Sequence, residues 1–314
     1  MAAHEHRPLA GHAIMSKDES LVNQKLAGKG GLPLKRSTPF LYTVGGLQKF
    51  GTDPASRGKG DIMIELKEVS KSYDGVRKAV DQLTLDIRDG EIFGFLGPNG
   101  AGKTTTLKLI TGLLSLDQGS ISVNGFDIEK EGLEAKKRLA FVPDNPDTFQ
   151  RLKGIEYLRF IADVYGVDQA LRQQRVEALT RRFGIHDVLN QMIKTYSHGM
   201  KQKIILCGAL LHDPENWILD EPMTGLDPAS SFELKQLMRE HADKGKTVLF
   251  STHVLEVAEK VCDRLSVIDN GKLLFVGSMD QLKARYADDA SLESLFLRLV
   301  REGDQEAALA AEAW

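Results

Sequence analysis

The chain has 314 residues, of which 42% are hydrophobic and 27% are charged, a composition typical of a globular protein with a sizeable core. The net charge of −3 excludes a global field that would attract nucleic acid. The two cysteines, Cys207 and Cys262, lie far apart and neither belongs to a CxxC pair, which argues against a disulfide framework or a zinc site and suits a reducing compartment. No run approaches the roughly 18 apolar residues of a membrane span. Any work at a membrane is therefore expected to go through a partner.

Residues 1–60 differ in composition from the rest of the chain. They contain nine Lys or Arg and four Asp or Glu, so the remainder of the chain is net negative. They are rich in Gly, Pro, Ser and Lys and show no sustained period of 2 or 3.6 residues. This composition predicts a disordered or extended segment, within which FLYTVGGL (40–47) is a short apolar patch.

From residue 62 onward the apolar pattern becomes regular. Alternating or clustered apolar residues predict β structure in 62–73, 78–87, 91–96 and 118–128, whereas 103–114 and 153–182 are predicted as helical. The chain then alternates, with strand 216–220, helix 231–245, strand 246–253, helix 254–262 and hairpin 265–277. The expected fold is α/β, with a core of alternating strands and helices, an antiparallel β subdomain and an α-helical subdomain insertion at about 145–210.

A phosphate-binding loop follows the predicted strand 91–96. GPNGAGKT (97–104) matches G-x-x-x-x-G-K-[ST] and opens a predicted helix, which is the context that this motif requires. Its backbone N–H groups and the helix N-terminus are suited to phosphate oxygens. Lys103 is expected to hold the β- and γ-phosphates and Thr104 to offer its hydroxyl to Mg²⁺. The predicted cofactor-binding residues here are Gly97, Pro98, Asn99, Gly100, Ala101, Gly102, Lys103, Thr104 and Thr105.

Two adjacent carboxylates end the predicted strand in WILDEP (217–222). Adjacent acids on a buried strand are costly unless a cation or hydrogen bonds compensate them. The functional interpretation assigns Asp220 to Mg²⁺ and Glu221 to the attacking water, since phosphoryl transfer needs mainly a positioned nucleophile and neutralised charge. The alternative is a solvated exit from the strand into a turn.

Five motifs occur in order: the phosphate loop, TYSHGMKQK (195–203), WILDEP, GLD (225–227) and STH (251–253). Over residues 62–300 this order resembles the ATP-binding subunits of ABC transporters. No N-K-x-D motif of the GTPases is present. The resemblance implies an ATPase that uses ATP and Mg²⁺. It implies that Tyr73 stacks on adenine, that Asp227 belongs to a dimer contact, and that His253 is a switch histidine near the γ-phosphate.

TYSHGMKQK precedes an apolar helix, so Ser197 has two interpretations. It is a suitable cap for its own helix. In the family, however, this segment covers the γ-phosphate held by a second, head-to-tail subunit, with Ser197 and the N–H of Gly199 as donors. His198 and Met200 depart from the usual LSGGQ pattern. Asp144, in FVPDNPD (141–147), stands where the family usually has glutamine and is expected to reach Mg²⁺ or its water.

The resemblance is strongest to the bacterial ABC-2 exporter-like group. It implies a homodimer of ATP-binding subunits that closes on ATP and works with separate transmembrane permease subunits at the cytoplasmic face of the membrane, without nucleic acid. The alternative is a soluble ABC ATPase acting on ribosomes or nucleic acid; a degenerate module that does not hydrolyse ATP is expected to lose Glu221 or His253.

Near the C-terminus, the apolar positions of SLESLFLRL (291–299) share one predicted helix face and are expected to pack on the core, followed by a polar tail at 301–314.

Overall fold

The computed structural model describes residues 60–286 and 291–312, and side chains as far as residue 303. The prediction for residues 1–60, including the patch at 40–47, falls almost entirely outside the described residues. No helix in the described part of the chain is long and apolar enough to span a lipid bilayer.

Within the described residues, six strands form the central sheet in the order β10-β9-β3-β8-β7-β6. The strands β9, β3, β8, β7 and β6 run parallel to their neighbours, and β10 closes an antiparallel hairpin with β9. Every residue of β3, β7 and β8 is buried, as expected for parallel strands covered on both faces. The strands are β3 (Ile92–Leu96), β6 (Leu139–Val142), β7 (Asn216–Leu219), β8 (Thr247–Thr252), β9 (Arg264–Asp269) and β10 (Lys272–Gly277).

A second, antiparallel sheet has the order β2-β1-β4-β5. It contains β1 (Ile62–Ser72), β2 (Lys78–Arg88), β4 (Gln118–Val123) and β5 (Phe126–Asp127). Apolar residues of its first strands share a core with β3 and α1 (Lys103–Ile110). The predicted antiparallel β subdomain is therefore confirmed, and it packs beside the phosphate loop.

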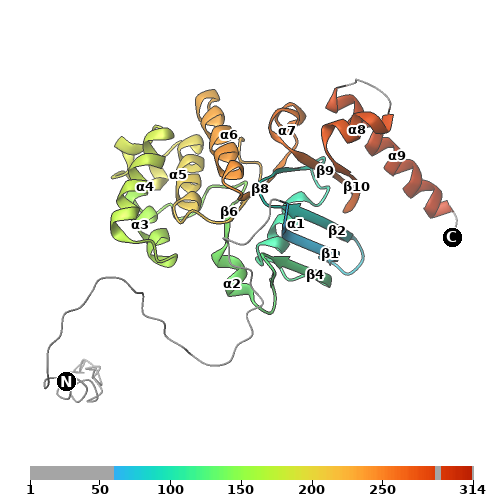
Figure 1. The fold of residues 1–314 in the computed structure, drawn as a ribbon, viewed down its shortest axis with the longest axis horizontal. Coiled ribbons are helices and arrows are strands. Elements are labelled where there is room, and N and C mark those ends of the chain that lie inside the picture. Colours follow the sequence, from blue (N-terminus) through green and yellow to red (C-terminus); the bar gives the residue numbers. More distant parts are fainter. Residues whose placement is uncertain (1–59, 287–290, 313–314) are drawn as a thin grey trace, which may run out of the picture. The chain divides into compact units, whose positions relative to one another are not determined.

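A helical subdomain is inserted between β6 and β7. It contains α3 (Gly154–Val164), α4 (Gln169–Arg182) and α5 (His198–Leu210), which contact one another and lie together in Figure 1. Two short 3₁₀ turns, His186–Val188 and Ile193–Thr195, connect α4 to α5. The remaining helices are α2 (Gly132–Lys137), α6 (Pro228–Asp243), α7 (Leu255–Val261), α8 (Met279–Tyr286) and α9 (Leu292–Glu312).

Several elements differ from the sequence predictions. The strand β6 and the helices α2 and α8 were not anticipated, because each is too short to show a clear period. Helix α6 begins at Pro228, three residues before its predicted start. Helix α1 ends at Ile110, four residues before the predicted end, and Gly112 adopts φ +62° just beyond it.

The C-terminal helix packs as predicted but is longer than predicted. Leu292, Leu295 and Leu299 are buried in one cluster with Leu265 and Val267 of β9, and Phe296 packs against that cluster. The helix continues through residue 312, so the expected boundary between the domain and a polar tail at residue 300 lies inside α9.

The parallel strands of the central sheet place the candidate functional segments at one edge of that sheet. Since β3, β7 and β8 run in the same direction, the segments that follow them emerge at the same edge of the sheet. Those segments are the phosphate loop after β3, Asp220 and Glu221 after β7, and His253 after β8.

Candidate functional site

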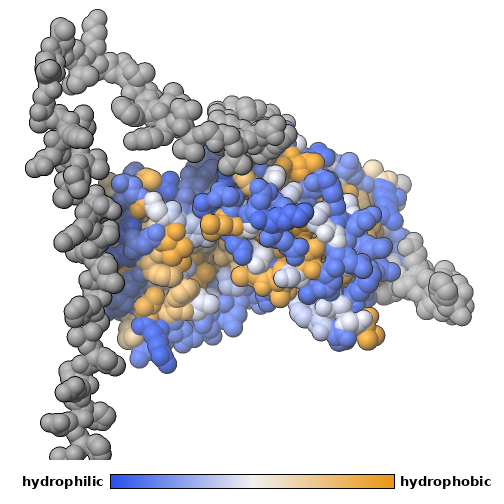
Figure 2. All heavy atoms as spheres, turned by 90° about the horizontal axis from the view of Figure 1, so that it is seen from below, coloured by the Kyte–Doolittle hydropathy of each residue, from blue (hydrophilic) through white to orange (hydrophobic). Residues whose placement is uncertain are grey.

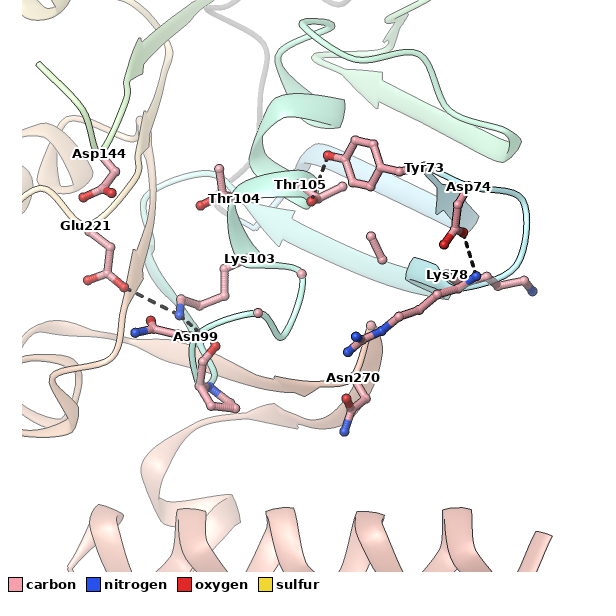
Figure 3. Close-up of a pocket in the computed structure, with 16 residues that line it drawn as sticks. Tyr73, Asp74, Lys78, Asn99, Lys103, Thr104, Thr105, Asp144, Glu221 and Asn270 are labelled. Atoms are coloured by element: carbon pink, nitrogen blue, oxygen red, sulfur yellow. Dashed lines mark hydrogen bonds and ion pairs between the residues drawn. The ribbon is translucent and has the colours of Figure 1, made fainter. Parts of the chain in front are cut away.

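A pocket of about 450 Å³ opens around the loop between β3 and α1 (Figure 3). Gly100 and Gly102 have φ of +84° and +108°, the left-handed region that favours glycine. Gly97 is needed for a different reason, because a Cβ there would lie 2.4 Å from the carbonyl oxygen of Ile268. The loop therefore closes tightly against β9 and leads its backbone into the N-terminus of α1. An anion in the pocket would meet backbone N–H groups and the positive end of the helix dipole.

The side chain of Lys103 lies in the middle of this loop and is only 7% exposed. Its Nζ donates to the carbonyl oxygens of Gly97 at 2.7 Å and Pro98 at 3.2 Å. It also lies 3.6 Å from Oε1 of Glu221, an ion pair drawn in Figure 3. These oxygens stabilise the ammonium group of Lys103 away from water, and the group can also bind an anion in the pocket.

The two carboxylates of WILDEP have different surroundings. Asp220 is 1% exposed, and its Oδ1 accepts a hydrogen bond of 2.7 Å from Oγ of Ser251 in β8. The same Oγ accepts from the backbone N–H of Glu221 at 2.9 Å. Ser251 therefore joins the ends of β7 and β8 and satisfies two polar groups that would otherwise be buried without partners.

Glu221 turns away from the strand into the pocket. Its φ of +46° is in the left-handed region, where a non-glycine residue stores about 1–2 kcal/mol of strain. Its Oε2 lies 3.0 Å from Nδ1 of His253, and its Oε1 faces Lys103. The structure thus brings Lys103, Glu221 and His253, from three different strand ends, into one contiguous arrangement.

Asp144, just after β6, lines the same pocket and faces Glu221 (Figure 3). Partial burial raises the pKa of its carboxyl group, and the nearby carboxylates of Asp220 and Glu221 raise it further, whereas His198 and His253 lower it. Three acidic groups close together near the Thr104 hydroxyl are the oxygen donors that a divalent cation prefers. No cluster of three or more His, Cys, Asp or Glu side chains among the described residues forms a complete metal site by itself.

Tyr73 stands at the other end of the pocket. Its side chain is 65% exposed, and its hydroxyl shares a hydrogen bond of 3.2 Å with Oγ1 of Thr105 (Figure 3). The ring is therefore available to stack on a planar ligand, and the hydroxyl ties it to the first turn of α1.

The segment TYSHGMKQK does not line this pocket. Ser197 is the N-cap of α5, and its Oγ accepts from the backbone N–H of Met200 at 3.3 Å. Ser197 and His198 are exposed, and Gly199 is half-buried. Within one subunit the serine acts as a helix cap, and the N-terminus of α5 is open to solvent.

The sequence analysis missed several residues of the site. Asp74, Arg77, Lys78, Ala79, Asn270 and Gly271 also line the pocket. The hairpin turn Asn270-Gly271 reaches it because Gly271 N–H donates to the carbonyl of Ala101 at 2.9 Å. The only sequence signal for these residues was the basic pair Arg77-Lys78 after the YDG turn, and this pair did not indicate where in the fold it would lie. The role of Ser251 was also missed, although it is the first residue of STH.

Comparisons with known proteins identify the family of the chain. The family model of ABC transporters matches residues 80–224. The uncharacterized ABC transporter ATP-binding protein YhcH of Bacillus subtilis is 40% identical over 216 residues, which cover 68% of each chain. The daunorubicin/doxorubicin resistance ATP-binding protein DrrA of Streptomyces peucetius is 36% identical over 236 residues, 75% of this chain and 69% of DrrA. A solved structure of the ATP-binding subunit of an ABC transporter is 33% identical with a TM-score of 0.73, covering 76% of this chain and 99% of its own.

The chain belongs to the ATP-binding proteins of ABC transporters. This ABC subunit accordingly binds ATP and hydrolyses it to drive transport. Its phosphate-loop fold is that of the ABC ATPases, as the ordered motifs predicted. The relatives are transporter subunits, which disfavours the alternative of an ATPase acting on ribosomes or nucleic acid.

Replacing Ser251 tests whether its hydrogen bonds to Asp220 and Glu221 stabilise the fold. In this ABC subunit Ser251→Ala is expected to lower the free energy of unfolding by about 1–3 kcal/mol, because it leaves buried polar groups of Asp220 and Glu221 without a partner. Urea unfolding of the purified protein measures the difference. Ser266→Ala is the matched control, since Ser266 in β9 is equally buried but its hydroxyl has no hydrogen-bond partner. Equal losses in the two variants would contradict the bridging role.

Proposed function

We propose that the pocket around residues 97–105 binds ATP and that the arrangement of Lys103, Glu221 and His253 hydrolyses it. The contact of Glu221 with both Lys103 and His253 carries this proposal, because it connects a phosphate-binding cation, a carboxylate and an imidazole. The loop backbone and Thr105 surround the phosphates, and Tyr73 stacks on the adenine.

Glu221 is the proposed catalytic base. Its carboxylate orients the attacking water and accepts its proton, while His253 holds the second oxygen of that carboxylate and fixes its direction. Lys103 supplies positive charge where negative charge develops on the phosphoryl oxygens. Its present contacts with loop carbonyls and Glu221 are interactions that phosphate oxygens would replace.

Mg²⁺ fits this set of donors. The hydroxyl of Thr104 and the carboxylates of Asp144 and Asp220 would hold it, and the ion would supply charge neutralisation for the β- and γ-phosphates. Asp220 already accepts a hydrogen bond from Ser251, so its carboxylate is oriented by the protein.

The second proposal concerns a homodimer. Ser197 and Gly199 lie at an exposed helix N-terminus outside their own pocket, which is a suitable anion site for a neighbouring molecule. We infer that this segment covers the γ-phosphate bound by a second copy of the chain, and that ATP closes the two subunits while hydrolysis lets them separate. Asp227, in the adjacent loop, belongs to the same proposed contact.

The third proposal concerns membrane partners. Figure 2 shows hydrophobic side chains gathered at the end of the molecule where the helical subdomain lies. Phe149 is 44% exposed and Phe160, in α3, is 46% exposed, and their ring centroids are 5.8 Å apart. The ring of Phe149 also lies 5.1 Å from that of Tyr157. Such an exposed aromatic cluster favours a partner contact. We infer that transmembrane permease subunits dock here at the cytoplasmic face of the membrane, and that ATP hydrolysis powers export or another form of membrane transport.

Glu221→Gln tests the catalytic base. The amide keeps the size and shape of the side chain but cannot accept a proton from water at neutral pH, so turnover is expected to fall at least about 100-fold. ATP binding is expected to persist, and the ATP-bound dimer is expected to accumulate. Phosphate release and size-exclusion chromatography with ATP measure the two effects. Turnover near that of the wild type would remove Glu221 from the base role.

Ser197→Ala tests the contact between subunits. ATP binding to the monomer is expected to be unchanged, while hydrolysis and ATP-dependent dimerisation fall, because the hydroxyl acts on nucleotide held by the other copy. Asp168→Ala is the matched control: it removes the N-cap of α4, costing about 0.5–2 kcal/mol, without touching either pocket. Loss of nucleotide binding in monomeric Ser197→Ala would place the serine in its own site and contradict the dimer.

Phe160→Glu tests the docking surface. Introducing a charge at the aromatic cluster is expected to reduce the fraction of the protein that sediments with membranes of the host cell by several-fold, because the carboxylate cannot be buried without a partner. ATP hydrolysis by the purified subunit is expected to remain unchanged. Leu133→Glu is the control, since Leu133 is 71% exposed on α2. A similar loss from both variants, or from neither, would contradict docking at Phe160.

A further inference from the structure

The imidazole of His198 packs against the loop that follows the two carboxylates. Gly225, with φ +76°, lies beneath the ring so closely that a Cβ at this position would be 2.4 Å from Cδ2 and 2.9 Å from Nε2 of His198. Another residue at 225 would force the ring to move from this position and would also be strained at that φ. His198 and Gly225 are therefore fitted to each other within one subunit.

Two more contacts connect α5 to the same loop. A Cβ at Gly199 would lie 2.7 Å from the carbonyl oxygen of Gly225, so the helix backbone approaches the loop directly. Farther along the helix, Nζ of Lys203 lies 2.7 Å from Oδ2 of Asp227. The first turn and a half of α5 thus contacts the loop at successive positions.

The loop in turn is connected to Glu221. The backbone N–H of Thr224 donates to the carbonyl of Glu221 at 3.1 Å, and that of Leu226 donates to Met223 at 3.2 Å, so residues 221–226 form two overlapping turns. At its far end Asp227 caps α6 by accepting from the N–H of Ser230 at 2.9 Å. Between these anchors, Thr224 and Gly225 are exposed, and α5 contacts Gly225 through His198 and Gly199.

We propose that His198 is a positioning residue for ATP hydrolysis. Its ring holds the loop 221–227 of the same subunit in place and thereby fixes the backbone conformation from which the Glu221 side chain reaches the pocket. The proposal rests on the catalytic role proposed above for Glu221. The strained φ of Glu221 needs such support, because a residue held in a sparsely populated conformation relaxes when its surroundings loosen. The proposed role also explains why an imidazole stands between Ser197 and Gly199, because the edge of the ring fills the space over Gly225, which has no side chain.

The competing role for this imidazole is that of a hydrogen-bond donor to a phosphate of the second subunit. The two roles require different properties of the side chain. Holding the loop requires a flat ring, whereas donating requires a polar hydrogen. Phenylalanine keeps the first property alone, glutamine keeps the second alone, and alanine keeps neither.

The loop itself is tested without nucleotide. In the whole nucleotide-free chain, His198→Ala is expected to increase hydrogen–deuterium exchange several-fold in a peptide covering 222–227, whereas His198→Phe leaves it near the wild-type rate. A peptide from α4 is the internal control, because α4 contains neither His198 nor any residue of the loop. Unchanged exchange at 222–227 in His198→Ala would overturn the proposal, whatever role Glu221 has.

Turnover is tested on the same proteins. His198→Ala is expected to lower kcat by about 10-fold with little change in KM for ATP, since displacing a catalytic group reduces the rate more than it reduces binding. His198→Phe is expected to recover most of that loss, and His198→Gln to recover little. Recovery by glutamine but not by phenylalanine, or an effect confined to KM, would overturn positioning in favour of a phosphate donor. Glu221→Gln separates the two proposals, because wild-type turnover in that variant contradicts the base role and leaves the exchange result on the loop unaffected.

Discussion

The site depends on the buried ammonium group of Lys103. An ion with little access to water is tolerated only where oxygen atoms surround it, and here the oxygens come from the loop itself and from Glu221. The loop can present those carbonyl groups because Gly97 lets it approach β9 and Gly102 lets it turn into α1. The ion pair with Glu221 then connects the end of β3 to the end of β7. Loss of the loop geometry would therefore leave both a cation and a carboxylate without compensation.

The remaining polar groups of the pocket follow from the same edge of the sheet. Ser251 connects β8 to the Asp220 carboxylate and to the backbone N–H of Glu221, and His253 reaches the Glu221 carboxylate two residues later. Figure 3 shows Asp144 and Glu221 near the Lys103 end of the pocket and Tyr73, Asp74 and Lys78 at the other end. One end therefore has carboxylates that suit a cation, and the other has an exposed ring that suits a planar ligand. This division matches a nucleotide triphosphate with its metal ion at one end and its base at the other.

The N-terminus of α5 combines two kinds of interaction at neighbouring residues. Ser197 caps its own helix, while the ring of His198 and the backbone of Gly199 pack on the loop 225–227. In the proposed dimer the same turn also faces nucleotide on the second subunit. The contacts within the subunit give that turn a fixed orientation before any partner arrives, which reduces the entropy that closure must overcome. A departure from the usual family pattern at position 198 is therefore compatible with an intact site.

The sequence by itself determined the class of the protein. GPNGAGKT, WILDEP and the apolar patterns around them were sufficient to predict the phosphate loop, the paired carboxylates and the α/β core with its helical insertion, while the role of His253 was implied by the resemblance of the ordered motifs to the family. These features are local, because glycine conformations, strand runs and helix periods depend on neighbouring residues. Only the tertiary structure decided that Ser251 joins Asp220 to Glu221, that the Asn270 turn enters the pocket, and that His198 packs on Gly225. Each of these contacts joins residues that are distant in the sequence. The first two follow from the strand order β10-β9-β3-β8-β7, and the third follows from the packing of α5 on the loop after β7. No local pattern encodes that order, since the pairing is set by the packing of the whole chain.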